Sequence, residues 1–251
     1  VRLFNLENCL GQGGSMKFGT SVTRQVDIKR RRARMLPLWF VVSVQAAALL
    51  LLCSVRCAAM SDEERATIVQ LHNEIRNSVA LGQLNNWPAA SDMQQMSYSN
   101  ELEELAKTHL ENCVFEPGCI GCNIGQDNRP GQNLYAMAGP ANWTRAVNFW
   151  GQAPIEFVMP TSPGNPVHMK VSVLSQLLWS KSNKVGCAWK DCYAKTGNSL
   201  YLCNYMPAGN EIGGHVYMSG KACSRCPQGT CCSNRCPHKT QPAYEGLCAP
   251  Q

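Results

Sequence analysis

Apolar residues that recur every three or four positions predict a helix over residues 61–80. The repeat runs from Ile68 to Val79 and places its members on one helical face. Ser61, followed three residues later by Glu64, has the spacing of a capping box that begins such a helix. The same periodicity predicts three further helices, over 99–112, 142–152 and 169–181.

Alternation of apolar and polar residues marks a second kind of element later in the chain. It runs through 184–192 and again through 199–206, with the turn sequence Thr-Gly-Asn between the two segments. This pattern predicts a β-hairpin. A shorter strand or turn is expected over 131–136. Helices and strands are therefore mixed, which indicates an α+β protein.

The composition changes after about residue 220. Residues 221–248 contain six cysteines in 28 positions and almost no aliphatic side chains. Such a segment cannot build an apolar core, so we expect a small disulfide-rich module with its boundary near Ser219.

The first 59 residues predict a leader rather than part of a folded domain. Residues 29–34 are basic, residues 35–55 carry no charge, and small residues follow up to Ala59. This order is typical of a secretory signal peptide over 35–59. A membrane anchor is the alternative, because the uncharged run is long enough to span a bilayer. Residues 1–34 are interpreted as an upstream translated segment, with Met35 or Met16 as the true start.

The formal net charge of +6 comes from this leader. Residues 1–59 carry nine Lys or Arg against two Asp or Glu, whereas residues 60–251 carry 14 against 15. The mature chain therefore has no electrostatic footprint for nucleic acid or for a membrane surface. We expect it to be secreted, extracellular and monomeric, with no stable membrane insertion after cleavage.

Twelve cysteines follow the leader, an even number that predicts six disulfides in an oxidising compartment. They are Cys113, Cys119, Cys122, Cys187, Cys192, Cys203, Cys223, Cys226, Cys231, Cys232, Cys236 and Cys248. Cys203 is expected to bridge to Cys187, to Cys192 or to the long loop before residue 131. A zinc cluster in the tail is the alternative to its disulfides. The sequence Asn142-Trp143-Thr144 is an N-glycosylation sequon, which predicts an exposed Asn142.

Four short motifs, in order along about 150 residues, carry a family resemblance. They are LHNEIR at 71–76, GQNLY at 131–135, LSQLLWSKSNKVGC at 174–187 and YLCNYMPAGN at 201–210. Together they resemble the CAP superfamily of cysteine-rich secretory proteins, antigen 5 allergens and plant pathogenesis-related proteins. The resemblance implies a three-layer α-β-α sandwich over 60–219. It also implies that 220–251 is similar to the hinge that follows this domain in cysteine-rich venom proteins.

The resemblance also implies a cleft that holds a divalent metal on two histidines and two acidic residues. The four positions fall on His72, Gln132, Ala153 and Val173, so only a histidine is retained. A shifted alignment would bring His168 or Glu156 into the cleft instead. Zinc needs three or four N, S or O ligands, and we therefore expect no metal, no cofactor and no catalytic residue. His72 is interpreted as a hydrogen-bonded helix histidine.

Because the metal-binding positions are replaced, we expect the protein to act by binding a target rather than by catalysis. The first hypothesis is a non-enzymatic effector, similar to venom, salivary or defence proteins, that binds an extracellular protein such as an ion channel. The second is a lipid or sterol carrier, with Met93, Met96 and Met159 lining a groove, although core packing explains these residues equally well. The third is a CAP-type endopeptidase.

Overall fold

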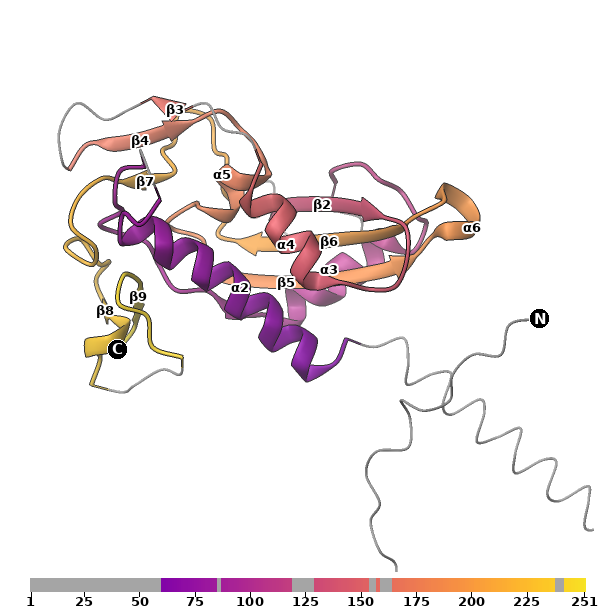
Figure 1. The fold of residues 1–251 in the computed structure, drawn as a ribbon, viewed down its shortest axis with the longest axis horizontal. Helices are drawn as coiled ribbons and strands as arrows, with labels where there is room; N and C mark the ends of the chain where they lie inside the picture. The colour runs from indigo at the N-terminus through magenta and orange to yellow at the C-terminus, as the bar shows by residue number, and fades with distance from the viewer. Residues whose placement is uncertain (1–59, 85–86, 119–128, 154–156, 159–163, 238–241) are drawn as a thin grey trace, which may run out of the picture. The chain divides into compact units, whose positions relative to one another are not determined.

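The structure, a computed structural model, describes residues 60–251 except 85–86, 119–128, 154–156, 159–163 and 238–241 (Figure 1). The predicted upstream segment and signal peptide, together with Cys119, Cys122, Glu156 and Met159, lie outside the described residues. The described residues belong to one compact unit, 58–251.

A four-stranded sheet in the order β1-β5-β6-β2 forms the middle layer. Its strands are β1 (Ser97–Tyr98), β2 (Gly131–Met137), β5 (Lys184–Asp191) and β6 (Ser199–Met206). The predicted hairpin is confirmed, because β5 and β6 pair antiparallel over their full lengths. The short helix α6 (Tyr193–Thr196) and the following Gly197, at φ +77°, reverse the chain between them. Strand β1 is parallel to β5 and was not predicted.

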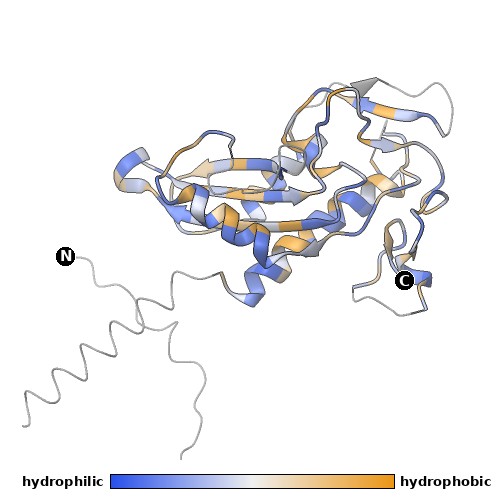
Figure 2. Ribbon diagram, turned by 180° about the vertical axis from the view of Figure 1, so that it is seen from behind, coloured by the Kyte–Doolittle hydropathy of each residue, from blue (hydrophilic) through white to orange (hydrophobic). Residues whose placement is uncertain are grey.

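Helix α2 (Asp62–Ala80) lies along one face of this sheet (Figure 1). It begins as predicted, because the Ser61 side chain accepts a hydrogen bond from the Glu64 backbone and the Glu64 carboxylate accepts one from the Ser61 backbone. Figure 2 shows hydrophobic and hydrophilic residues alternating along the helices, as expected for elements with one buried face. Ile68 and Val79 are fully buried in the main core.

Helix α3 (Asn100–Leu110) covers the opposite face, against β5 and β6. It begins after Ser99, whose hydroxyl accepts a hydrogen bond from the Leu102 amide, and thus confirms the prediction over 99–112. A separate cluster of buried side chains fills this second interface. Its members are Ala106, Leu110, Ala188, Cys192, Leu200 and Leu202. The three layers are therefore α2 with its neighbours, the sheet, and α3.

Helix α4 (Trp143–Gly151) packs beside α2 and confirms the third predicted helix. The fourth prediction, a helix over 169–181, is wrong in extent. Residues Pro166–Met169 form strand β4, and α5 spans only Val173–Leu177. The helix begins late because Ser172 caps it. It ends early because the carbonyl groups of Leu177, Trp179, Ser180 and Ser182 turn toward the Arg76 guanidinium instead of continuing the helical ladder.

A second, smaller sheet has the order β3-β4-β7. Strand β3 (Phe157–Val158) and strand β7 (Tyr217–Met218) both pair antiparallel with β4. Val167 and Tyr217, which are paired in register, are fully buried and belong to the main core. The second sheet is thus joined to the sandwich through shared apolar packing.

Five disulfides are present among the described residues. They are Cys113–Cys192, Cys187–Cys203, Cys223–Cys232, Cys226–Cys248 and Cys231–Cys236. Of the three partners considered for Cys203, the structure selects Cys187, the residue directly opposite on β5. The three bridges of the tail all close within the tail. The sixth bridge stays a prediction.

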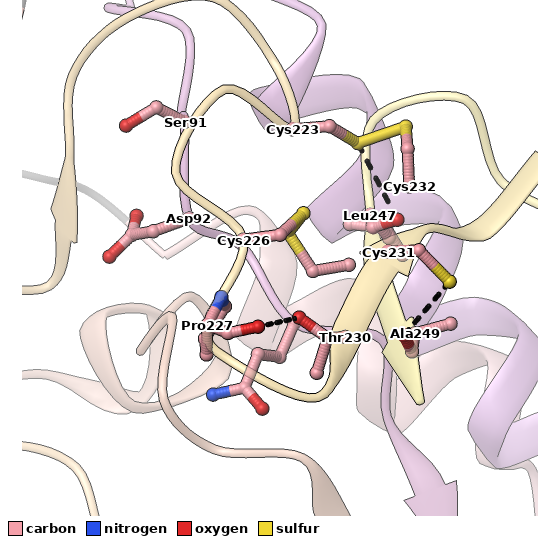
Figure 3. Close-up of a disulfide and its surroundings, with 12 residues drawn as sticks. Ser91, Asp92, Cys223, Cys226, Pro227, Thr230, Cys231, Cys232, Leu247 and Ala249 are labelled. Carbon is pink, nitrogen blue, oxygen red and sulfur yellow. Dashed lines mark hydrogen bonds between the residues drawn. A yellow bond between two sulfur atoms is a disulfide. The ribbon is translucent and has the colours of Figure 1, made fainter. Parts of the chain in front are cut away.

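The tail contains strand β8 (Thr230–Cys232), the 3-10 helix η3 (Ser233–Arg235) and strand β9 (Cys248–Pro250). Figure 3 shows its cysteines gathered around the β8–β9 ladder, with Ser91 and Asp92 of the main domain close by. The tail is tied to the main domain by backbone hydrogen bonds from Cys248 to Met93 and from Arg225 to Ser91. Leu247 and Tyr244 enter the main core cluster.

The turn after β6 owes its Gly-Asn sequence to two separate requirements. A Cβ atom on Gly209 would lie 2.8 Å from the Trp179 side chain, so glycine is needed for close approach. The left-handed backbone belongs to the next residue, Asn210, at φ +59°, a conformation that asparagine tolerates better than most residues. Asn210 also joins Ser172 and Ser175 by side-chain hydrogen bonds, and so fixes the start of α5.

Candidate functional site

Three polar residues of the LHNEIR motif occupy the buried face of α2. His72, Asn73 and Arg76 each have no solvent exposure. The Asn73 side chain both donates to the Met96 carbonyl and accepts from the Met96 amide, at 2.9 and 2.8 Å. It therefore binds the segment before β1 as another strand would. The motif that points most strongly to chemistry thus lies inside the protein.

His72 is the centre of a closed chain of hydrogen bonds. Its Nδ1 lies 2.7 Å from the Ile68 carbonyl oxygen, which can only accept, so Nδ1 carries the proton. Its Nε2 lies 2.9 Å from the Tyr205 hydroxyl and accepts a hydrogen bond from it. Asn133 then donates from Nδ2 to the Tyr205 oxygen at 3.2 Å and to the Val173 carbonyl at 2.8 Å. Both imidazole nitrogens are therefore already engaged.

Burial fixes the protonation of this chain. It lowers the pKa of His72 to about 4, and the nearby Arg76 charge acts in the same direction. Burial raises the pKa of Tyr205 well above its usual range. The imidazole and the phenol are therefore both neutral at pH 7. The prediction of a hydrogen-bonded helix histidine agrees with this geometry.

Arg76 binds the carbonyl groups of five residues without a carboxylate partner in its hydrogen-bond set. Its three nitrogens reach Gln94, Leu177, Trp179, Ser180 and Ser182 at 2.7 to 3.2 Å. Burial lowers the pKa of this guanidinium to about 9, so it remains charged at neutral pH. Its role is to organise the turns around α5 and the segment before β1.

Gln132 lies on the other face of the sheet from this chain. It is paired in register with Asn204, whereas its neighbour Asn133 is paired with Cys203. Successive side chains of a strand point to opposite faces. Gln132 donates from Nε2 to the side-chain oxygen Oδ1 of Asn204 at 2.9 Å. Its own Oε1 accepts a hydrogen bond from the Gly118 backbone amide at 2.8 Å. Asn204 in turn donates to the Leu102 carbonyl of α3.

The placement of His72 in a cleft with Gln132 is therefore a prediction that the structure corrects. His72 reaches Asn133 through Tyr205, on the face covered by α2, while Gln132 reaches Gly118 and α3. The physical reason is the two-residue period of β2, which separates adjacent side chains by the thickness of the sheet. Sequence order alone did not reveal on which face each motif residue would lie.

The remaining two cleft positions are aliphatic and only partly buried. Ala153 follows α4, Val173 begins α5, and both pack against the main core. A divalent cation needs several N or O ligands around one point. One neutral amide, two aliphatic side chains and an imidazole on the far face do not fit such an ion. The residues at these four positions therefore do not form the metal site that the family resemblance implied.

The alternative ligand His168 lies on β4, exposed, with Nδ1 3.1 Å from the Gly214 carbonyl. Its ring stands edge-on to His215 at a centroid distance of 6.4 Å. The other alternative, Glu156, lies outside the described residues.

Met93 and Met96, proposed to line a lipid groove, are fully buried members of the main core. Their packing role is thus the one that the structure shows.

The strongest charge cluster joins α2 to α3. Glu103 is almost fully buried and accepts hydrogen bonds from Arg65 at 2.8 Å and from the Tyr98 hydroxyl at 2.8 Å, and it pairs with Lys107 at 2.6 Å. Burial alone would raise the pKa of Glu103, but these three donors outweigh it and lower the pKa to about 2. A permanently ionised, triply bonded carboxylate is a structural clamp rather than a proton donor.

Three sulfur atoms of the tail, from Cys223, Cys226 and Cys248, lie within 4.8 Å of one another. Each belongs to a disulfide, so none is available as a thiolate ligand. This observation favours the disulfide prediction over a zinc cluster.

Among the described residues, no helix combines the length and the apolar character needed to cross a bilayer.

The sequence comparison places this geometry in a family. A model of the cysteine-rich secretory protein family, CAP, matches residues 69–205, from the buried face of α2 to Tyr205. The chain belongs to the CAP family. The match spans α2 to β6, and the α-β-α sandwich described above is the fold that the motifs predicted.

Similar curated proteins include venom allergen 5 of Tityus serrulatus, 33% identical over 207 residues that cover 78% of this chain and 50% of that protein. A cysteine-rich venom protein of Tityus serrulatus is 32% identical over 75% of this chain and 46% of its own length. Peptidase inhibitor 16 of Mus musculus is 33% identical over 70% of this chain and 34% of its own. The chain spans about half the length of the first two.

Solved structures confirm the fold. Na-ASP-1 superimposes with a TM-score of 0.58 at 28% identity, covering 76% of this chain and 48% of that one. NaASP2, solved with Zn²⁺, has a TM-score of 0.57 at 26% identity and covers 75% of this chain and 96% of its own. The zinc of NaASP2 is a property of that protein, and the cleft positions described above do not reproduce a ligand set here.

Two features of the site were missed from sequence. The first is the hydrogen bond from the Gly118 amide to the Gln132 side chain, which places Gly118, eight residues after α3, against β2. The second is Tyr205 as the partner of His72, 133 positions away. The second was within reach of sequence reasoning, because both residues belong to recognised motifs. The first depends on a loop path that no periodicity encodes.

Proposed function

We propose that this chain is a secreted, non-enzymatic CAP protein that acts by binding an extracellular protein target. The observation that carries the proposal is the hydrogen bonding of Gln132. Its hydrogen-bond partners among the described residues are the Asn204 side chain and the Gly118 amide, and neither can gain or lose a proton near neutral pH.

Peptide hydrolysis needs a base to activate water or a nucleophile, and an acid to protonate the leaving amine. The candidate base, His72, has no solvent exposure, has both nitrogens engaged and lies on the far face of the sheet. Its low pKa also reflects a site that water does not reach. The geometry therefore supports recognition rather than an endopeptidase.

Two further observations support an extracellular binding protein. Five disulfides hold the described residues together, which suits an oxidising compartment. Two of the similar proteins are named a venom allergen and a cysteine-rich venom protein. By analogy, the target class to test first is a membrane protein with an exposed ectodomain, such as an ion channel.

The decisive experiment uses the disulfide-intact protein in two assays. The first measures cleavage of a quenched peptide library between acidic and alkaline pH, with and without Zn²⁺. The second measures binding to a panel of immobilised ectodomains and the effect on channel currents. We expect no cleavage and saturable binding to one target class. Cleavage that is lost in Gln132→Ala would contradict the proposal, as would an absence of binding across the panel.

A lipid or sterol carrier is the alternative. Met93 and Met96 do not favour lipid carriage, because both side chains are buried in the main core. Native mass spectrometry of the protein purified from eukaryotic cells tests this alternative directly. A stoichiometric lipid adduct that survives purification would favour carriage over protein recognition.

A further inference from the structure

Asn142 has two structural roles, one through its side chain and one through its backbone. It is the N-cap of α4, where its Oδ1 accepts a hydrogen bond from the Arg145 amide at 2.8 Å. Its own backbone N–H donates to the Tyr201 hydroxyl at 3.0 Å, which anchors the start of α4 on β6. These bonds fix the residue firmly, although its side chain is exposed to solvent.

The cap uses only half of the side-chain amide. The oxygen is engaged, whereas Nδ2 has no hydrogen-bond partner among the described residues. Thr144, the third residue of the sequon, is exposed, and Trp143 between them is buried at 4% exposure. A substituent on Nδ2 therefore leaves the cap and the packing of Trp143 intact.

A groove lies beside this nitrogen, between the starts of α4 and α2. Its volume is about 260 Å³, close to the small end of the range of about 300–1,000 Å³ seen for ligand pockets. One wall carries the sequon, and the other is the first turn of α2. The lining residues are Ser61, Glu63, Glu64, Thr67, Ala141, Asn142, Trp143 and Thr144. Carboxylate and hydroxyl groups on the α2 wall are suitable acceptors for sugar hydroxyl groups.

Trp143 lines the groove, while its indole nitrogen is buried and has no hydrogen-bond partner among the described residues. The groove thus combines an attachment point with a polar wall.

We propose that Asn142 carries an N-linked glycan whose first sugar lies in this groove against the first turn of α2. The donor is a lipid-linked pyrophosphate oligosaccharide of the secretory pathway. A bond forms between Asn142 Nδ2 and the anomeric carbon of the first sugar, while the bond from that carbon to the pyrophosphate oxygen breaks. Nδ2 loses one proton, and the lipid pyrophosphate leaves with the bonding electron pair.

The attachment is tested on the full mature chain, secreted from eukaryotic cells behind a foreign signal peptide. This proposal rests on the secretion assumed in the proposed function, and the foreign signal separates a failure of residues 35–59 from a failure of the sequon. Mass spectrometry of the natural sequence and of Thr144→Ser should show a glycan on Asn142, and Thr144→Ala should show none. An unmodified Asn142 in the secreted natural sequence overturns the proposal.

The position of the first sugar is tested by comparing three forms of one preparation. Endoglycosidase leaves a single N-acetylglucosamine, and peptide N-glycosidase removes the whole glycan and leaves aspartate, which caps a helix as well as asparagine does. We expect amide hydrogen exchange in Glu63–Thr67 to be several-fold slower in the full and single-sugar forms than in the sugar-free form. The amides of the β8–β9 ladder in the tail, which does not line the groove, serve as the internal control. Equal exchange in all three forms overturns the groove contact.

Discussion

The surroundings of Arg76 and the cysteine-rich tail hold their chains in place by different means. At Arg76, one buried guanidinium binds the carbonyl groups of five residues, in a region with a large apolar core. In the tail, three disulfides connect short strands that carry few aliphatic side chains. Covalent bonds take over where apolar burial is too small to order a chain.

The difference teaches that a change in composition is not the same as a break in packing. The tail begins to lose aliphatic residues near Ser219, yet Leu247 returns to the main core with no solvent exposure. The Gly246 amide donates to the Asn77 side chain of α2 at 2.8 Å. The tail is therefore closed internally by its disulfides and docked externally by a few apolar and backbone contacts. Independent folding of residues 60–219 stays a prediction.

The largest expected effect is at the Arg76 site. Arg76→Met removes the charge but leaves buried carbonyl groups unpaired, so we expect a loss of more than about 4 kcal/mol in the free energy of unfolding. Urea denaturation followed by tryptophan fluorescence measures it. Arg65→Met is the control, because the Arg65 side chain is 27% exposed and should cost far less. A loss below about 1 kcal/mol for Arg76→Met would show that water takes over the carbonyl groups.

The docking of the tail is the next largest effect. A chain that ends at Ser219 should still fold and melt cooperatively, but with a loss of about 3 kcal/mol, since burial of one large apolar side chain contributes about 1.5–3 kcal/mol. Calorimetry of both lengths measures the change. In the full chain, Leu247→Ala should produce most of the same loss. Aggregation of the shorter chain would show that the two regions form one folding unit.

Acid should weaken the α2 region through His72. Its pKa is about 4 in the folded state and about 6.5 in the unfolded chain, so the unfolded state binds more protons between these values. Stability should therefore fall by about 2 to 3 kcal/mol as the pH drops from about 7 to about 4.5. Denaturation at several pH values measures the slope, and His72→Gln should flatten it. His168→Gln is the control, because His168 is exposed and lies outside this hydrogen-bonded chain. An unchanged slope in His72→Gln would exclude His72 as the cause.

The smallest of the four effects concerns the clamp between α2 and α3. Glu103→Gln keeps the shape but removes the charge bound by Arg65 and Lys107, and we expect a loss of about 1 to 2 kcal/mol. The folded pKa of Glu103 is lowered, so this stabilisation is present above the unfolded value of about 4.3 and is lost as the pH falls through about 2. The difference in the free energy of unfolding between Glu103→Gln and the natural sequence should therefore shrink as the pH falls from about 4.3 to about 2. A difference that persists at the acid end of this range would point to packing instead of charge.

Prediction from sequence succeeded where a local period was strong. The capping box fixed the start of α2, the alternation in 184–192 and 199–206 fixed the hairpin, and the motifs fixed the family. It failed at α5, where an apolar run looked helical on both sides of Ser172. The competing interactions there are long-range, because β4 pairs with β7 and Arg76 binds the carbonyl groups after the helix.

The candidate cleft shows the same division. The residue types at the four positions assigned to the cleft can be read directly from the sequence, and the assignment itself stays a prediction. Sequence could not place His72, because the face on which a side chain lies depends on strand register and on a partner 133 positions away.

The sequence by itself determined the starts of α2, α3 and α4, the hairpin, the count of cysteines and the CAP family, since each rests on neighbouring residues or on residue identity. Only the tertiary structure decided which cysteine bridges Cys203, which face of the sheet His72 occupies, and that Leu247 of the tail completes the main core. The physical reason is that these outcomes depend on pairings between distant segments. Their free energy comes from burial and hydrogen bonds that exist only once the chain has folded.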